Sequence, residues 1–411
     1  MSIFRIHIYL KIKHFIQSFL TKKNSLRKKS EIIISKKTNK KFTILVGQLR
    51  VGFYLVLKYL KKKYPDKKEV IMNSYNLAVM VNICKSLGLK VIFVKLNKNL
   101  FLSAKELKKK INKNTLAVVA TNIFNTSKDI KDVKTICKKK KTFLIEDNAI
   151  YFGNYTKVKG KKTYSGTYGD YSLNSFNIMK IISAMYGGSV STNDSKFHLF
   201  ANQEIKNFRN FPMYKYFKQC LVFIMLKLIA IKLLYNQIFF RILKKAHISN
   251  NNFFLSIVYP SLKFKKEKFT AKELTKISPL SLKMIWLQLN NDTTLKKNHE
   301  IKKDNNDYYF KMLKKLKIKD LKLINLEDSN FQNFNDFPIF VNKKKELVNF
   351  LFNKGIETKT VQYVDCQRLF GNRNDRMIEK YEKKVLCLPN HHKVTKKYIE
   401  YIVKNISIFY E

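Results

Sequence analysis

The sequence predicts an α/β protein with a mainly parallel sheet covered by helices, followed by a small α+β domain. Between residues 42 and 200, apolar runs rich in β-forming residues alternate with segments of helical periodicity, and this alternation is typical of parallel sheets. Beyond residue 315, shorter strand-like and helical segments alternate again. The chain has 411 residues, of which 45% are hydrophobic. It can therefore bury a large core, which excludes a wholly disordered protein.

Each expected element has a local justification. In the first domain, strands are expected at 42–46, 69–75, 91–96, 116–124 and 142–149, and helices at 49–64, 77–88, 103–111 and 129–140. Pro65 ends the first of these helices, Gly88 closes the second, and Ser103 is a suitable N-cap for the third. In the last domain, strands are expected at 321–326 and 338–342, and helices at 345–355 and 397–410.

Polar and aromatic residues stand where several of the expected strands end. Tyr75 closes one strand, Asn122 and Asn125 follow another, and Asp147 comes directly after the apolar run 143–145. Ligands of open parallel sheets bind at the carboxyl ends of the strands. A carboxylate at this place packs poorly against a core, so we interpret Asp147 as a ligand contact.

Lys180 is the second candidate of chemical interest. It lies between an apolar stretch and the pair Gly187-Gly188, which predicts a tight turn between two strands. A lysine amine together with a carboxylate is what a pyridoxal phosphate enzyme needs. The amine binds the cofactor and moves protons, and the carboxylate keeps the pyridine nitrogen protonated.

Several segments resemble, in order, motifs of the DegT/DnrJ/StrS family of sugar aminotransferases, which are fold-type-I pyridoxal phosphate enzymes. The segments are LIEDNAIYFG (144–153), SFNIMK (175–180), GGSVSTND (187–194), NSYNLAVMVNICKSLGLKVIFV (73–94), GIETKTVQY (355–363) and VLCLPNHHKVT (385–395). The resemblance extends from about residue 42 to the C-terminus, with a poor match at 205–262. It implies a seven-stranded type of sheet, a homodimer, and pyridoxal 5'-phosphate as cofactor.

The resemblance also implies roles for individual residues. Lys180 is expected to carry the cofactor as a Schiff base and to act as the acid and base of the proton shift. Asp147 is expected to pair with the pyridine nitrogen, and Tyr75 to stack on the ring. Contacts with the cofactor phosphate are expected from three further residues, namely Ser175, Gly47 and Arg50.

The sequence departs from the family pattern at several of these places. Ile150 replaces the usual glutamine after the aspartate motif, and Val51 replaces a serine or threonine near the start of the phosphate helix. Each lost hydrogen bond to a phosphate weakens binding by about 1–3 kcal/mol. A degenerate, non-catalytic relative that acts as a binding protein is therefore the alternative hypothesis.

The charge balance is strongly positive. The chain has 82 lysines and arginines against 29 acidic residues, for a formal charge of +53, and only eight of the basic residues are arginines. The lysines are spread along the whole chain, so we predict no specific nucleic-acid binding. Two interpretations of the charge stay open: a compositional bias of the genome, or a selected role in binding polyanions.

Two segments lie outside the family pattern. We expect a basic amphipathic extension at 1–41 that either lies on an anionic membrane or is loosely packed. We expect an apolar and basic helical insertion at 205–262 that either packs on the protein or contacts a membrane surface. The large cofactor-binding domain then covers 42–204, and 263–411 contains an interface helix and the small domain.

The sequence thus predicts an aminotransferase that acts on a keto sugar. The resemblance implies that the sugar is nucleotide-linked and that an amino acid such as glutamate is the donor. The products of this enzyme would serve polysaccharide or glycoconjugate synthesis. The five cysteines are widely spaced and form no metal-ligand pattern, which favours a reducing compartment and no metal. We therefore expect a cytoplasmic protein, with contact to the inner face of the membrane as an option.

Overall fold

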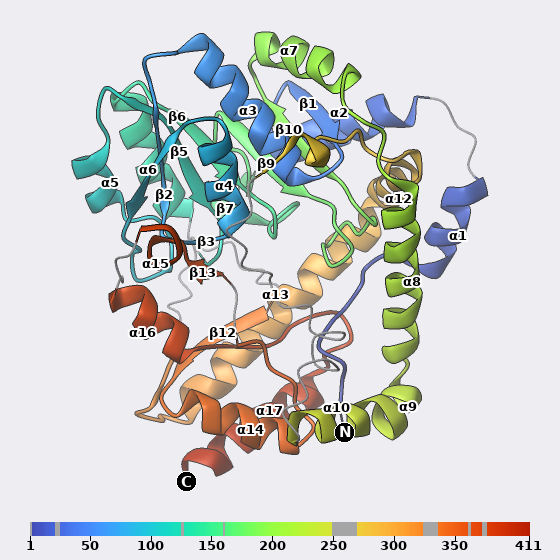
Figure 1. Cartoon of the computed structure of the whole chain (residues 1–411). Helices are drawn as coiled ribbons and strands as arrows, with labels where there is room; N and C mark the ends of the chain where they lie inside the picture. Colours follow the sequence, from blue (N-terminus) through green and yellow to red (C-terminus); the bar gives the residue numbers. More distant parts are fainter. Residues whose placement is uncertain are drawn as a thin grey trace.

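A seven-stranded sheet forms the centre of the large domain (Figure 1). The computed structural model describes residues 2–20, 25–124, 127–158, 161–248, 269–323, 336–360, 363–371 and 376–411. The strand order is β1 (Phe42–Val46), β10 (Gly188–Thr192), β9 (Tyr171–Ser175), β6 (Phe143–Asp147), β5 (Thr115–Thr121), β2 (Glu69–Asn73) and β4 (Lys90–Val94). All pairs are parallel except the two that β10 makes with its neighbours. The predicted, mainly parallel sheet is confirmed.

Helices cover both faces of this sheet because successive strand residues point to opposite sides. Val70 and Met72 of β2 join a core with α3 (Leu49–Lys63), α4 (Ala78–Ser86) and α7 (Ser195–Lys206). Ile71, between them, joins a different core with α5 (Ala104–Lys110), α6 (Ser127–Lys139) and the C-terminal domain. The predicted cap is present, since the Ser103 hydroxyl accepts a hydrogen bond from the Glu106 amide.

A small three-stranded sheet, in the order β11 (Leu321–Leu323), β12 (Asp336–Val341) and β14 (Val385–Pro389), forms the C-terminal domain. It packs with α13 (Asp292–Lys315), α14 (Lys344–Asn353), α16 (Arg376–Lys384) and α17 (Lys396–Tyr410). The short strand β13 (Val364–Asp365), followed by α15 (Cys366–Gly371), pairs with β3 (Tyr75–Asn76). This pairing brings the C-terminal domain to the edge of the large sheet where β2 ends.

The N-terminal segment is part of the fold rather than a loose arm. Residues 2–10 are extended, and every second side chain is buried, including Phe4, Ile6, Ile8 and Leu10. The expectation of a loosely packed extension is therefore wrong for these residues, because they alternate between core and surface as a strand does. The extension continues with α1 (Ile12–Leu20) and α2 (Leu26–Thr38), both of which contact α12 (Pro279–Leu289).

The insertion forms a run of helices along one side of the molecule (Figure 1). They are α8 (Met213–Ile229), α9 (Lys232–Leu234), a π-helical turn η1 (Tyr235–Phe239) and α10 (Phe240–Ile248). Residues 249–262 of the predicted insertion lie outside the described residues. One face of α8 is buried, which confirms packing on the protein. Among the described residues, no helix combines the length and hydropathy needed to cross a membrane.

Candidate functional site

The predicted ligand edge of the sheet is formed by the carboxyl ends of six strands. Because all strands of the sheet except β10 run in the same direction, they all end at this edge. Asp147 is the last residue of β6 and Ser175 the last of β9, while Tyr75 follows β2 after one residue. The topology therefore brings these predicted residues to one side of the sheet, as the sequence pattern implied.

Asp147 and Lys180 are close enough to influence each other's ionisation. Asp147 is only 3% exposed, and burial raises the pKa of its carboxyl to about 6, although the Ala149 amide and Lys180 act in the opposite direction. Burial lowers the pKa of the Lys180 amine to about 8, although Asp147 opposes this change. The pair is thus a desolvated acid and base that titrate within about two pH units of each other, as catalytic groups often do.

A long loop, rather than the expected tight turn, carries Lys180. β9 and β10 pair directly, Ser175 with Gly188, and the loop 176–187 connects them. The Ser183 hydroxyl donates to the carbonyl oxygens of Ile178 and Lys180, and the Ser183 backbone exchanges two hydrogen bonds with the side chain of Gln288 on α12. The prediction of a tight turn was wrong because the glycines serve close packing instead of a turn, while α12 holds the loop.

Gly188 and Gly47 allow chain segments to pack closely at the start of α3. A Cβ atom on Gly188 would lie 2.4 Å from the Leu49 amide nitrogen, and one on Gly47 would lie 2.5 Å from the Thr275 carbonyl oxygen. The N-terminus of α3 therefore lies beside the end of β9, where Ser175 is. Amide groups at a helix N-terminus bind phosphate well, so the predicted roles of Gly47 and Ser175 fit this place but stay predictions.

Arg50 is engaged in an ion pair. Its guanidinium lies 3.1 Å from the carboxylate of Glu273, and its side chain is partly exposed. Val51, the next residue, is fully buried in the apolar core. Val51 has no hydrogen-bond donor in its side chain, and the Arg50 guanidinium would have to share its N–H groups between Glu273 and a phosphate.

Tyr75 is buried under the C-terminal domain. Its ring meets the ring of Tyr363 edge-on at a centroid distance of 5.6 Å, and its hydroxyl accepts a hydrogen bond from the Tyr363 amide at 3.3 Å. Tyr363 in turn lies within electrostatic range of Asp147. Tyr363 therefore lies near the Asp147 carboxylate, and it is a site residue to which the sequence motif assigned no role.

A group of charged residues beside Lys180 was missed by the sequence analysis. Asp336 of β12 forms an ion pair with Lys359 at 3.2 Å and interacts electrostatically with Arg5 and Lys302. Lys359 lowers the pKa of Lys180, and Lys180 in turn lowers the pKa of Lys302. No sequence signal separated these cations from the many surface lysines, because their role depends on how the N-terminal segment and the small domain fold against the large one.

Pyridoxal phosphate fits the donor set at this edge. The Asp147 carboxylate would stabilise a protonated ring nitrogen, and the Lys180 amine is already partly desolvated. Two buried oxygen atoms at this edge, Oδ1 of Asn122 and Oγ of Ser74, have no hydrogen-bond partner. Buried polar atoms are usually paired, so these two mark a place where a polar ligand would be stabilised.

Known proteins support this interpretation of the geometry. The family model of the DegT/DnrJ/EryC1/StrS aminotransferases matches residues 14–226. GDP-perosamine synthase of Escherichia coli O157:H7 is 30% identical over 178 residues, which are 43% of this chain and 47% of that protein. GDP-perosamine synthase of Vibrio cholerae is 36% identical over 126 residues, 30% of this chain and 33% of that protein. The matched segments thus span only a third to a half of these relatives.

The whole fold matches a solved structure of the same type. Helicobacter pylori PseC, an aminotransferase involved in the biosynthesis of pseudoaminic acid, superposes with a TM-score of 0.72 at 15% identity and covers 100% of this chain and 99% of that one. This likeness confirms the predicted fold-type-I architecture. Because the family model covers just over half of the sequence, the chain belongs to the DegT/DnrJ/EryC1/StrS aminotransferase family.

Proposed function

We propose that the protein is a pyridoxal-phosphate-dependent aminotransferase that transfers an amino group from an amino acid, such as glutamate, to a nucleotide-linked keto sugar. The observation that carries the proposal is the pair of the buried Asp147 and the half-buried Lys180 at the carboxyl edge of the sheet. The bound cofactor would supply an electron-accepting ring that makes the α-proton of an amino acid acidic.

The residues of this chain have separate tasks in that reaction. With a pKa of about 8, roughly one Lys180 amine in ten is neutral at pH 7, so this side chain can both accept and return a proton. Asp147 is mainly ionised at that pH and would stabilise a positive charge on the ring nitrogen of the bound cofactor. Asp147 and its neighbour Tyr363 are both buried, and this weakly polar environment would strengthen the interaction.

The cations around the pair fit a phosphorylated substrate. Lys359 pairs with Asp336 of β12 in the small domain, and the Lys302 amine lies over the ring of Tyr9 in the N-terminal segment. A sugar linked to a nucleoside diphosphate carries two negative charges that such cations attract. If this attraction contributes to binding, the KM for the nucleotide sugar rises with ionic strength; a KM that does not change with salt would contradict it.

A dehydratase function is less well supported than transamination. GDP-4-keto-6-deoxy-D-mannose 3-dehydratase of Yersinia pseudotuberculosis is 28% identical over 163 residues, 38% of this chain. The family resemblance implies a histidine in dehydratases at the place of the cofactor-binding lysine. Lys180 occupies that place here, which favours transamination.

A non-catalytic binding protein is the second candidate function. Two observations favour it: Arg50 is paired with Glu273, and Val51 is buried in the core. Both remove polar contacts that a cofactor phosphate would use.

We also propose a homodimer in the cytoplasm. The five cysteines are all free and buried, as expected in a reducing compartment.

Absorbance spectroscopy distinguishes the two candidates. Purified protein is titrated with pyridoxal phosphate and then treated with borohydride, for the wild type, Lys180→Ala, and Lys105→Ala as a control at an exposed lysine of α5. An absorbance band that borohydride removes, present in the wild type and Lys105→Ala but absent from Lys180→Ala, supports the aminotransferase. No band in the wild type at saturating cofactor contradicts it and supports the non-catalytic candidate.

A further inference from the structure

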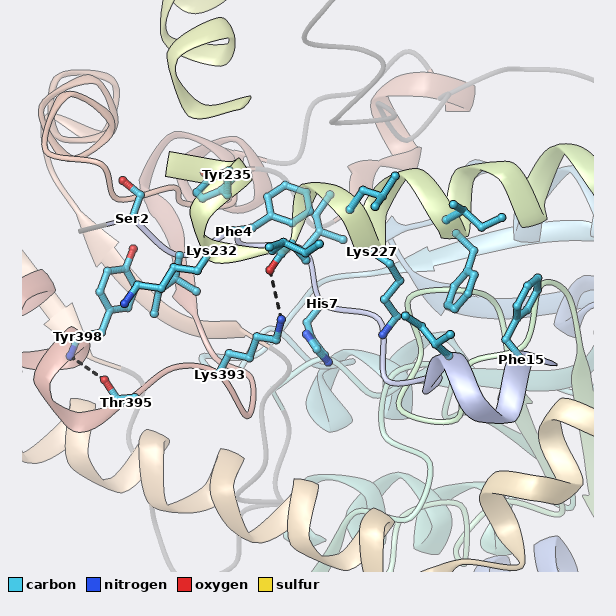
Figure 2. Close-up of a pocket in the computed structure, with 18 of the residues that line it drawn as sticks. Ser2, Phe4, His7, Phe15, Lys227, Lys232, Tyr235, Lys393, Thr395 and Tyr398 are labelled. Atoms are coloured by element: carbon cyan, nitrogen blue, oxygen red, sulfur yellow. Dashed lines mark hydrogen bonds between the residues drawn. The ribbon is translucent and has the colours of Figure 1, made fainter. Parts of the chain in front are cut away.

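A large groove lies between the N-terminal segment, α1, α8, α9 and the start of α17 (Figure 2). Its volume is about 1370 Å³, which exceeds the roughly 300–1,000 Å³ of ordinary small-molecule pockets. Lys180, Asp147 and the other residues of the candidate site do not line it. The proposed transamination therefore leaves this groove without a role.

The floor of the groove is apolar. Phe4 and Ile6 of the N-terminal segment, Phe15 of α1, and Phe223 and Ile231 of the insertion line it. Phe4 and Phe223 are buried against the core, so the floor is a fixed part of the fold. A surface of this kind is stabilised by contact with hydrocarbon rather than with water.

All charged residues among the described lining residues of the groove are cations. Five lysines line it, and no acidic residue is among its described lining residues; the lysines are Lys227, Lys232, Lys393, Lys396 and Lys397. The Lys227 amine donates to the Ile8 carbonyl oxygen at 2.8 Å, and the Lys393 amine donates to the Ala230 carbonyl oxygen at 3.3 Å. Burial and the neighbouring Lys393 lower the pKa of Lys227 to about 8. An anion placed between these two amines would therefore reduce their mutual repulsion and compensate for the cost of burying the Lys227 amine.

The apolar surface continues from the groove onto the outside of the helices. Leu221, Ile224 and Leu228 of α8 are exposed, Leu221 by as much as 68%, and so are Ile12 and Ile16 of α1. A helix face of leucine and isoleucine bordered by lysines is typical of segments that lie in a membrane interface. The lysine stems can extend along hydrocarbon and place their amines at the level of the lipid phosphates.

Charge argues against a second copy of the chain as the occupant. In a two-fold symmetric contact the same surface meets itself, so the five lysines of the groove would face those of the partner. Like charges that face each other across an interface oppose association. An anionic lipid bilayer offers the complementary charge together with hydrocarbon.

We propose that this groove is a docking site for anionic phospholipids of a membrane surface, with an acyl chain on the apolar floor and the lipid phosphate among the groove lysines. The exposed faces of α1 and α8 then lie in the interface beside it. Vesicle binding requires no pyridoxal phosphate, so the result of the following test and the result of the cofactor titration are independent of each other.

Vesicle flotation tests the electrostatic half of the proposal. Full-length protein is mixed with vesicles of phosphatidylcholine alone or of phosphatidylcholine with phosphatidylglycerol. The double variant Lys396→Gln/Lys397→Gln is compared with Lys105→Gln/Lys108→Gln, two exposed lysines of α5 that lie away from the groove. We expect binding to the anionic vesicles only, reduced about fivefold for each groove lysine removed, and little affected by the α5 variant. Equal losses in both double variants would mean attraction by net charge alone and would overturn the proposal.

A matched pair of apolar variants tests the hydrocarbon half. Leu228→Glu and Ile231→Glu add a negative charge at the groove, and Leu199→Glu adds the same charge at an exposed leucine of α7. We expect the groove variants to lose vesicle binding and Leu199→Glu to keep most of it. Circular dichroism checks that all three fold. If the groove variants bind vesicles as Leu199→Glu does, the proposal is wrong.

Quenching by brominated lipid locates the acyl chain directly. The chain has one tryptophan, Trp286, so Ile231→Trp adds a single reporter at the groove. Acyl chains brominated in their middle should quench the added fluorescence, measured as the difference from the wild type. No extra quenching with bound vesicles would show that hydrocarbon does not enter the groove.

Sedimentation without lipid tests whether a second copy of the chain occupies the groove instead. If the wild type is a dimer and Ile231→Glu dissociates it, the groove is an interface between two copies and the proposal is overturned.

Discussion

Replacing Asp147 with asparagine should stabilise the protein without cofactor while it abolishes cofactor binding. In the folded protein the pKa of Asp147 is raised from 3.8 to about 6. Because the folded state holds the proton more tightly than the unfolded state, ionisation of this carboxyl opposes folding. The cost starts as the pH passes the unfolded pKa and reaches its full value above the folded pKa.

The size of the effect follows from the two pKa values. One pKa unit corresponds to about 1.4 kcal/mol, so ionised Asp147 costs the folded protein about 3 kcal/mol near pH 8 and only about 0.5 kcal/mol near pH 4. Asparagine keeps an oxygen that can accept the hydrogen bond from the Ala149 amide at 3.1 Å. The variant should therefore gain up to about 3 kcal/mol near pH 8, with most of the gain developing between about pH 4 and pH 6.

Urea unfolding without cofactor, repeated across this pH range, measures the gain. Asp132→Asn, at an exposed carboxylate of α6, is the matched control and should change the free energy of unfolding by less than about 0.5 kcal/mol. A residue that stabilised the fold would give the opposite sign. If Asp147→Asn lowers the free energy of unfolding near pH 8, Asp147 is a structural residue and its interpretation as a cofactor contact fails.

Three further predictions concern neighbouring groups. Reductive methylation of the cofactor-free protein, followed by peptide mass spectrometry, should modify Lys180 with a midpoint near pH 8; a midpoint near that of ordinary lysines would contradict the desolvation of its amine. Gly188→Ala should destabilise the protein by about 1–3 kcal/mol in urea unfolding, because the added Cβ would lie 2.4 Å from the first amide nitrogen of α3. Gly371→Ala is the control and should be neutral, because its nearest neighbouring atom would lie 3.8 Å from the added Cβ. Tyr75→Phe removes the acceptor of the Tyr363 amide and should cost about 1 kcal/mol while the ring is kept. A cofactor affinity that falls as far in Tyr75→Phe as in Tyr75→Leu would exclude ring stacking by Tyr75.

The sheet was predictable because local signals and packing agree in it. Strands such as 116–124 are continuous apolar runs, as expected when helices cover both faces, and the structure places β5 there. The position of Asp147 at the carboxyl edge of the sheet could be predicted because parallel strands all end at the same edge. The hairpin of β7 (Tyr155–Val158) and β8 (Lys161–Tyr164) was not predicted, since polar lysines and threonines give its strands no clear alternation.

The loop of Lys180 shows where sequence patterns stop being informative. The glycine pair next to it matched a turn, yet the space that Gly188 leaves is filled by the start of α3. The hydrogen bonds that hold the loop come from Gln288, more than a hundred residues away. Turn rules use only neighbouring residues, so such a contact from a distant helix lies outside their reach.

The burial of Lys302 bears on whether the excess of lysine is only a compositional bias of the genome or also serves a function. A compositional bias toward lysine costs the folded protein little stability where the side chain is solvated. Such a bias therefore predicts that the additional lysines lie on the surface. Lys302 is only 1% exposed, and burial lowers the pKa of its amine to about 7. Burying a cation is costly unless a partner compensates, and Asp336 provides part of that compensation here. Surface solvation therefore does not account for Lys302. Because Lys302 interacts electrostatically with both Asp336 and Lys180, its replacement by methionine should affect the site without changing the surface charge.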